Sequence, residues 1–130
     1  MQAREVLHKL LIKTCGEMHA VRREALETVV WAGLTSQRMT VTGLGRAIGG
    51  IAREKHNIKR ADRLLSNPHL QSEREVMYGV LARRLVGSQR HPVLLVDWSD
   101  LDEWRRNQVL RVSLAVEGRA LTVCTVATRR

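Results

Sequence analysis

Asp97 is the residue in this sequence that is best placed to do chemistry. It follows the apolar run Val93-Leu94-Leu95-Val96, which Pro92 opens. Such a run predicts a strand covered on both faces, with Asp97 at or just past its buried end. A carboxylate in that position has to be hydrogen-bonded, paired with a cation or bound to a metal, because burial without a partner is costly. Two interpretations remain open: an Asx turn of Asp97, Ser99 and Asp100 that ends the strand, or a metal-binding catalytic carboxylate.

A second set of residues is suited to binding a polyanion. The pattern predicts a helix over about 57–65, with Asn57 as its N-cap and Ser66-Asn67-Pro68 as its stop signal. At about 100° per residue, its apolar side chains share one arc and its cationic side chains share another. The apolar set is Ile58, Ala61, Leu64 and Leu65. The side chains expected to contact DNA are Lys59, Arg60 and Arg63, supported by Arg53, Lys55 and His56 just before the helix. The alternative is a basic face that is merely solvated.

A shorter helix precedes this basic helix. Thr40 or Thr42 can cap it, Leu44, Ala47 and Ile48 give it an apolar side, and the pair Gly49-Gly50 must end it. A short helix, a glycine turn and a basic helix form the outline of a helix-turn-helix, whose second helix presents its polar face to the major groove of DNA.

The charge balance also points to a polyanionic partner. Twenty-two Lys and Arg residues against 13 Asp and Glu leave a formal charge of +9, which suits DNA and RNA equally. Four aromatic residues, none of them Phe, argue against a single-strand binder that stacks bases on exposed rings. Cys15 and Cys124 are isolated, which argues against structural zinc and fits small core residues in a reducing cytosol. With neither a signal-peptide pattern nor a membrane-spanning run, the expected localisation is cytoplasmic, with no membrane partner.

Two stretches of the sequence resemble one enzyme family. The stretch VLLVDWSDLDEWRRNQVLRVSLAVEGRALTV (residues 93–123) is similar to the first catalytic strand and following hairpin of bacterial insertion-sequence transposases with a DDE catalytic triad. The nearest group is the one numbered four among insertion sequences, which includes the transposase of the tetracycline-resistance cut-and-paste transposon. The stretch KHNIKRADRLLSN (residues 55–67) resembles a segment of the N-terminal helical DNA-binding region of those enzymes.

The resemblance implies a metal-dependent chemistry. In that family the aspartate of the first strand is the first metal ligand, and it falls on Asp97. The complete enzymes cut and join phosphodiesters with two Mg²⁺ ions, which stabilise the entering and leaving oxygens. The family's second aspartate and its glutamate have no counterpart before Arg130, so we expect Mg²⁺ not to bind tightly here and the polypeptide alone not to cleave DNA.

The expected fold class is α+β. Apolar spacing predicts helices over about 2–15, 21–32 with Gly33 as C-cap, and 72–86, the last opened by a capping box of Ser72 and Glu75 and ended by Gly87. A polar loop is expected over 98–106, followed by strands over 110–116 and 121–127 joined at Glu117-Gly118. We therefore expect a helical, helix-turn-helix-like DNA-binding domain at 1–88. At 89–130 the resemblance implies the first three strands, expected to be antiparallel, of a truncated ribonuclease-H-like catalytic domain.

Several functions fit these features. The first is the N-terminal portion of a transposase that binds the inverted-repeat ends of its transposon as double-stranded DNA. The others are a non-catalytic DNA-binding module or inhibitor of transposition, an RNA-binding protein, and an inert truncated remnant. An incomplete catalytic domain should also expose an apolar strand edge and sheet face, so self-association, for example as a homodimer, is expected.

Overall fold

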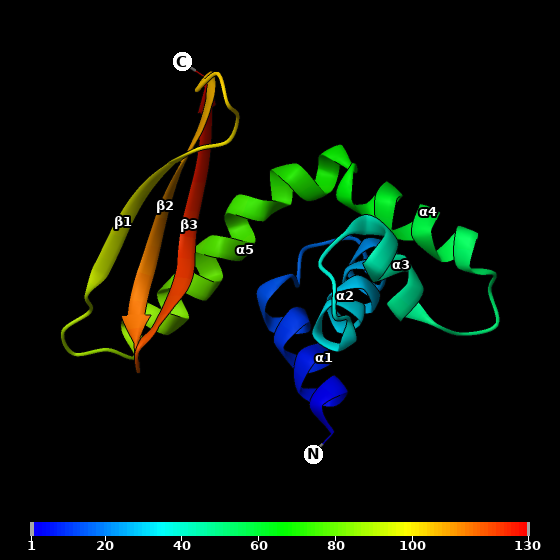
Figure 1. The fold of residues 1–130 in the computed structure, drawn as a ribbon. Helices are drawn as coiled ribbons and strands as arrows, with labels where there is room; N and C mark the ends of the chain where they lie inside the picture. Colours follow the sequence, from blue (N-terminus) through cyan, green and yellow to red (C-terminus); the bar gives the residue numbers. More distant parts are fainter. Residues whose placement is uncertain (1, 130) are drawn as a thin grey trace. The chain divides into compact units, whose positions relative to one another are not determined.

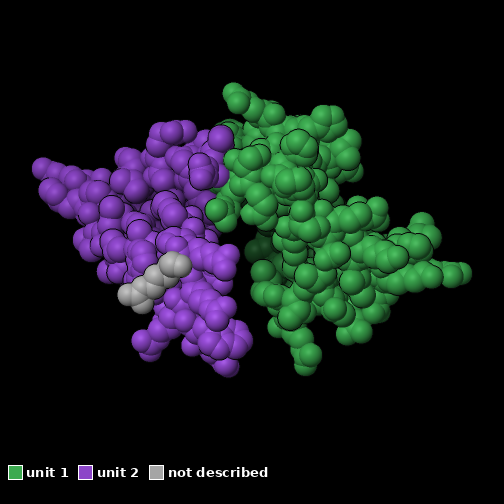
Figure 2. All heavy atoms as spheres, turned by 90° about the horizontal axis from the view of Figure 1, so that it is seen from above, with its two compact units in different colours: residues 1–74 green, residues 75–130 purple. Residues whose placement is uncertain are grey.

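The computed structural model describes residues 2–129 and has an α+β fold, as predicted. Five helices precede one antiparallel sheet of three strands (Figure 1). The chain divides into two compact units, residues 1–74 and 75–130 (Figure 2). The division falls inside the fifth helix rather than after it. No helix in the described part of the chain combines the length and the apolar character needed to cross a membrane.

The first unit is built on four helices and the start of a fifth. The helices are α1 (Ala3–Thr14), α2 (Ala20–Thr35), α3 (Val41–Ile48), α4 (Glu54–Leu65) and α5 (Pro68–Gly87). Apolar side chains from all five supply its core, namely Leu7, Leu11, Val29, Ala32, Leu44, Ala61, Leu64 and Leu70, together with Cys15 and Met18 from the α1–α2 connection. Cys15 is thus a core residue, as predicted.

The predicted end of α2 is wrong. Gly33 does not cap the helix, which continues to Thr35 and has Ser36 as its C-cap. A Cβ atom at Gly33 would lie 3.5 Å from side-chain atoms of Leu44 and Met39. The glycine therefore marks a place where α2 packs closely on its neighbours, which a sequence cannot distinguish from a helix end.

α3 and α4 pack tightly through a second glycine. A Cβ atom at Gly45 would lie 2.4 Å from the Cα atom of Ile58, so only glycine fits there. Thr40, one of the two predicted caps, accepts a hydrogen bond from the Gly43 amide at 3.1 Å. The pair Gly49-Gly50 ends α3 with φ angles of 65° and 88°, a left-handed backbone that favours glycine.

The predicted start of α4 is also wrong. The helix begins at Glu54, so Asn57 is not its N-cap but a buried residue of its second turn. Asn57 Nδ2 donates a hydrogen bond to the Gly49 carbonyl at 2.9 Å. The side chain therefore caps the end of α3 from within α4. The predicted stop after Leu65 is confirmed.

α5 begins four residues before the predicted capping box. Asn67 Oδ1 accepts a hydrogen bond from the His69 amide at 2.9 Å, and Pro68 occupies the first helical position, which suits a residue without an N–H group. Ser72 lies inside the helix and its hydroxyl donates to the His69 carbonyl. The predicted end at Gly87 is confirmed.

The sheet of the second unit has the order β1-β2-β3, with every pairing antiparallel, as predicted. Its strands are β1 (Leu94–Asp100), β2 (Asn107–Val116) and β3 (Arg119–Arg129). Glu117 and Gly118 have φ angles of 47° and 75°, which is the two-residue turn with positive φ at both central positions that matches strand twist. A bulge in the β2–β3 pairing lies at Val112/Ser113.

β1 differs from the prediction in length and in burial. It continues through Trp98, Ser99 and Asp100, so the predicted loop is shortened to residues 101–106. Its apolar residues are not covered, because Leu94, Leu95 and Val96 are between 48% and 67% exposed. Within the described residues β1 is an edge strand that pairs only with β2. Cys124 is likewise exposed rather than in a core.

Candidate nucleic-acid interface

The cationic residues predicted to contact DNA lie together at the surface of the first unit. Lys55, His56, Lys59, Arg60 and Arg63 are all exposed on α4, and Arg53 is exposed at its N-cap. At about 100° per residue, the five helical positions fall within roughly 140° of one another. Asn57, Ala61 and Leu64 are buried on the opposite side. We call these six cationic residues the α4 cationic face.

Packing fixes the direction in which this face points relative to α3. The close approach of Gly45 to Ile58 and the hydrogen bond from Asn57 to Gly49 hold α4 on its buried side. Leu65, predicted to be part of that side, is 42% exposed. His56 and Lys55, predicted to precede the helix, are placed on it because α4 begins earlier than expected.

Two acidic residues of α4, Glu54 and Asp62, are exposed near the α4 cationic face but form no ion pair with it within the described residues. Glu54, at the start of the helix, pairs instead with Arg46 of α3 at 2.8 Å. None of the six cationic residues forms an ion pair within residues 2–129. The Arg63 Nε atom donates to the Lys59 carbonyl at 3.3 Å, a contact to its own helix. The charges therefore remain open to an external anion.

A groove of about 490 Å³ lies beside this face, and the sequence did not reveal it. It is formed by residues of α2 and α4 and of the segments next to them. The lining residues are His19, Val21, Arg22, Ala25, Arg60, Arg63, Leu64 and Asn67. Arg60 and Arg63 thus belong to both the face and the groove. His19 and Arg22 were missed, because only the packing of α2 brings them near α4.

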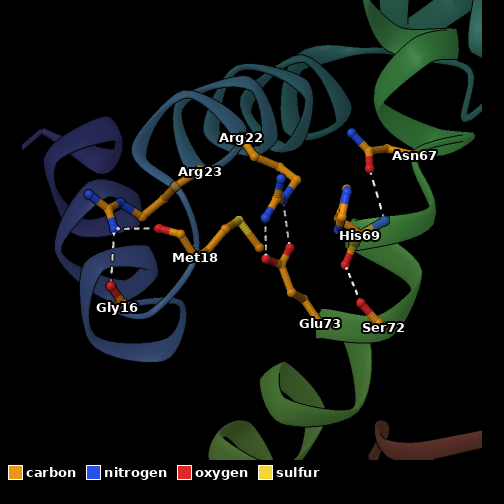
Figure 3. A network of polar contacts seen from close by, with 8 residues as sticks. All are labelled: Gly16, Met18, Arg22, Arg23, Asn67, His69, Ser72 and Glu73. Carbon is orange, nitrogen blue, oxygen red and sulfur yellow. Dashed lines mark hydrogen bonds and ion pairs between the residues drawn. The ribbon is translucent and has the colours of Figure 1, made fainter.

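Arg22 is already paired within the first unit (Figure 3). Its Nε and Nη2 atoms donate to the two carboxylate oxygens of Glu73 at 2.8 and 2.5 Å, a bidentate pair that joins α2 to α5. The hydrogen bond to Arg22 is the main reason that the pKa of Glu73 lies below its usual value, and the same contact raises the pKa of Arg22.

Asp97 lies in the middle of β1 rather than at a buried strand end, and its side chain is exposed. Its Oδ2 atom accepts a hydrogen bond from the Ser99 hydroxyl at 2.7 Å, and its backbone neighbour on β2 is Arg111. The Asx turn, one of the two interpretations of these residues, is therefore absent at 97–100, because the residues continue the strand. Asp100 is held instead by Gln108, at 2.9 Å.

The acids near Asp97 do not form a metal site. Asp102 binds the loop that follows β1, accepting hydrogen bonds from the Arg106 and Asn107 amides at 3.0 and 2.8 Å. The Arg106 amide is the largest cause of the lowered pKa of Asp102. Among the residues that the structure describes, no three His, Cys, Asp or Glu side chains are grouped so that they could hold a metal ion. One carboxylate does not fit the two-ion magnesium site that the resemblance implies.

Trp104 lies in the same loop and is 73% exposed. The Arg106 guanidinium carbon lies 5.7 Å from the centre of its ring.

The chain was compared with protein families, with curated proteins and with solved structures, and none of the three comparisons found a significant match.

Proposed function

We propose that this chain binds double-stranded DNA through the α4 cationic face. The observation that carries the proposal is a set of six exposed cationic residues, none of them ion-paired within residues 2–129, on one side of a helix whose other side is locked to α3. DNA presents a dense row of phosphates, and neutralising them releases counterions, which is the main source of non-specific affinity.

The pair α3 and α4 supports a helix-turn-helix mode of binding. Residues 49–53 connect the two helices, and the exposed side of α4 carries the cationic residues. In this mode α4 enters the major groove. Lys55 and Lys59 contact phosphates and set the register, whereas an arginine can read the O6 and N7 atoms of a guanine.

We further propose that the DNA is a transposon end and that the chain is the N-terminal portion of a DDE transposase. This step rests on the resemblance of residues 55–67 and 93–123 to that family. Asp97 would then be the first acid of the triad. Among the described residues Asp97 belongs to no group of three side chains that could hold a metal ion, and we assign no strand cleavage to it.

The DNA-binding proposal is tested by a matched pair of triple variants. Lys59→Ala, Arg60→Ala and Arg63→Ala remove three charges from α4, whereas Arg4→Ala, Lys9→Ala and Lys13→Ala remove three from α1. We expect the α4 variant to weaken binding to a random duplex at least tenfold. Each lost phosphate contact should flatten the dependence of log K on log salt by about 0.9. Fluorescence anisotropy over a salt series measures both.

Equal losses in the two triple variants would show that binding follows net charge alone and would refute the assignment to α4. Structured RNA that outcompetes duplex DNA at equal salt would show that the polyanion is RNA. For the transposase proposal, sites are selected from a random duplex library. A selected sequence that recurs as inverted repeats flanking the gene supports it, and the absence of any selected sequence counts against it.

A further inference from the structure

The groove beside α4 combines guanidinium groups with apolar walls. Arg22, Arg60 and Arg63 line it together with His19, and Val21, Ala25 and Leu64 supply the apolar part. Apolar walls displace water, which strengthens any charge-assisted hydrogen bond formed between them. The groove therefore suits an anionic group that is attached to an apolar one.

The guanidinium groups of the groove differ in what they already bind. Arg22 uses its Nε and Nη2 atoms in the bidentate pair with Glu73. Arg63 uses only its Nε atom, in a contact of 3.3 Å to its own helix. The Arg60 side chain forms no hydrogen bond or ion pair within residues 2–129. Arg60 and Arg63 are thus the two arginines of the groove that form no ion pair within residues 2–129.

The spacing of these two arginines suits one small anion. Residues three apart on a helix have Cβ atoms about 5–6 Å from each other, so the guanidinium groups of Arg60 and Arg63 can reach the same anion. A guanidinium presents its N–H donors in a plane that matches two oxygens of a phosphate. A backbone phosphate of DNA carries such oxygens, and the deoxyribose beside it is the less polar group that Val21, Ala25 and Leu64 can pack against.

We propose that this groove seats one backbone phosphate of DNA, held by Arg60 and Arg63 together. The proposal rests on the DNA-binding function and divides the α4 cationic face into two parts. Lys55 and Lys59 lie roughly 140° and 100° around the helix from Arg60, and neither lines the groove. Arg60 and Arg63 hold one phosphate in a defined position. Lys55 and Lys59 attract other phosphates of the DNA backbone by charge alone.

The groove is tested first with inorganic pyrophosphate, without DNA. Titration at constant ionic strength is followed by the NMR signals of the arginine Nε–H groups. We expect saturable shifts at Arg60 and Arg63 and none at Arg46 or Arg53. The Lys55→Ala, Lys59→Ala variant should titrate like the wild type, whereas Arg60→Ala should weaken pyrophosphate binding at least fivefold. Shifts spread over all arginines, or none at Arg60 and Arg63, would overturn the proposal.

Binding of duplex DNA then tests the groove assignment separately from the proposed DNA-binding function. The double variant Arg60→Lys, Arg63→Lys keeps both charges but replaces the planar guanidinium groups with ammonium groups. We expect this variant to bind DNA at least fivefold more weakly than the wild type, with nearly the same salt slope. If DNA binds and this variant is unimpaired, the groove assignment fails while the DNA-binding function stands. If pyrophosphate binds at Arg60 and Arg63 but duplex DNA does not bind at all, the DNA-binding function fails, and with it the assignment of the phosphate to DNA.

Discussion

The Asn57 side chain belongs to α4 but caps the end of α3. It lies on α4, is 3% exposed, and donates through Nδ2 to the last turn of α3 at Gly49. Its Oδ1 atom is buried and has no hydrogen-bond partner within the described residues. The residue is therefore held by one hydrogen bond at the junction of the two helices that carry the proposed interface.

Asn57→Ala should lower the free energy of unfolding by about 0.5–1.5 kcal/mol, because the hydrogen bond to the Gly49 carbonyl is lost. Urea denaturation followed by far-ultraviolet circular dichroism measures the change. Gln37→Ala, at an exposed position between α2 and α3, is the control and should leave the transition within about 0.5 kcal/mol of the wild type. An unchanged midpoint for Asn57→Ala would show that the hydrogen bond to Gly49 does not contribute to stability.

Glu73 gives the first unit a defined response to acid. Its pKa is lowered by Arg22, so its contribution to stability is fully present above about pH 4.3, the usual pKa of glutamate. The contribution is lost as the pH falls through the lower pKa of the folded state. The difference in melting temperature between the wild type and Glu73→Gln should be constant from about pH 5.5 to 7 and should shrink below pH 4. A difference that grows on acidification would contradict the pairing.

At the scale of elements, the close contact of α3 and α4 depends on a residue without a side chain. Gly45 allows the backbone of α3 to approach Ile58 of α4. The tight junction fixes the helix pair, and through it the direction of the α4 cationic face. At Gly33, between α2 and α3, a Cβ atom would make contacts of ordinary van der Waals length, so this position accepts a side chain.

Gly45→Ala should therefore destabilise the helical unit by about 1–3 kcal/mol, the usual cost of forcing extra volume into packed atoms. Gly33→Ala is the matched control, since it also adds one methyl group inside a helix. It should be neutral or stabilising by up to about 1 kcal/mol, because alanine favours helix and the space at Gly33 is adequate. Thermal unfolding of both variants measures the two changes in stability. Equal effects of the two substitutions would mean that the atoms of Ile58 move to accommodate the added methyl group at little cost in free energy.

At the scale of the whole molecule, the first unit carries the larger share of the net positive charge, +6 against +3 (13 − 7 and 9 − 6). Residues 1–74 contain 13 Lys and Arg against 7 Asp and Glu, whereas residues 75–130 contain 9 against 6. The six residues of the α4 cationic face all belong to the first unit. Electrostatic attraction of DNA should therefore favour the helical unit over the sheet.

Hydrogen–deuterium exchange with and without a random duplex tests this division. We expect slower amide exchange in residues 53–65 when DNA is bound, because contact and reduced helix opening both protect these amides. Residues 94–129 should exchange as in the free protein. Protection of the sheet instead of α4 would place the DNA on the second unit and would contradict the proposed interface.

The sequence by itself determined the number, type and order of the elements. Apolar residues recurring at helical or alternating spacing, and the turn residues Gly49-Gly50 and Glu117-Gly118, carry that information locally. It also determined that cationic residues share one side of α4, since that follows from the helical repeat alone. These features depend on neighbours within a few positions in the chain.

Only the tertiary structure decided which surfaces those elements expose. The apolar run before Asp97 predicted a covered strand but forms an exposed edge, because composition does not tell whether a partner strand lies on each side. Gly33 and Asn57 were assigned as caps from their types, yet both act in contacts between helices. Arg22 and His19 reach the groove only because α2 packs beside α4, and contacts between residues distant in sequence leave no local pattern.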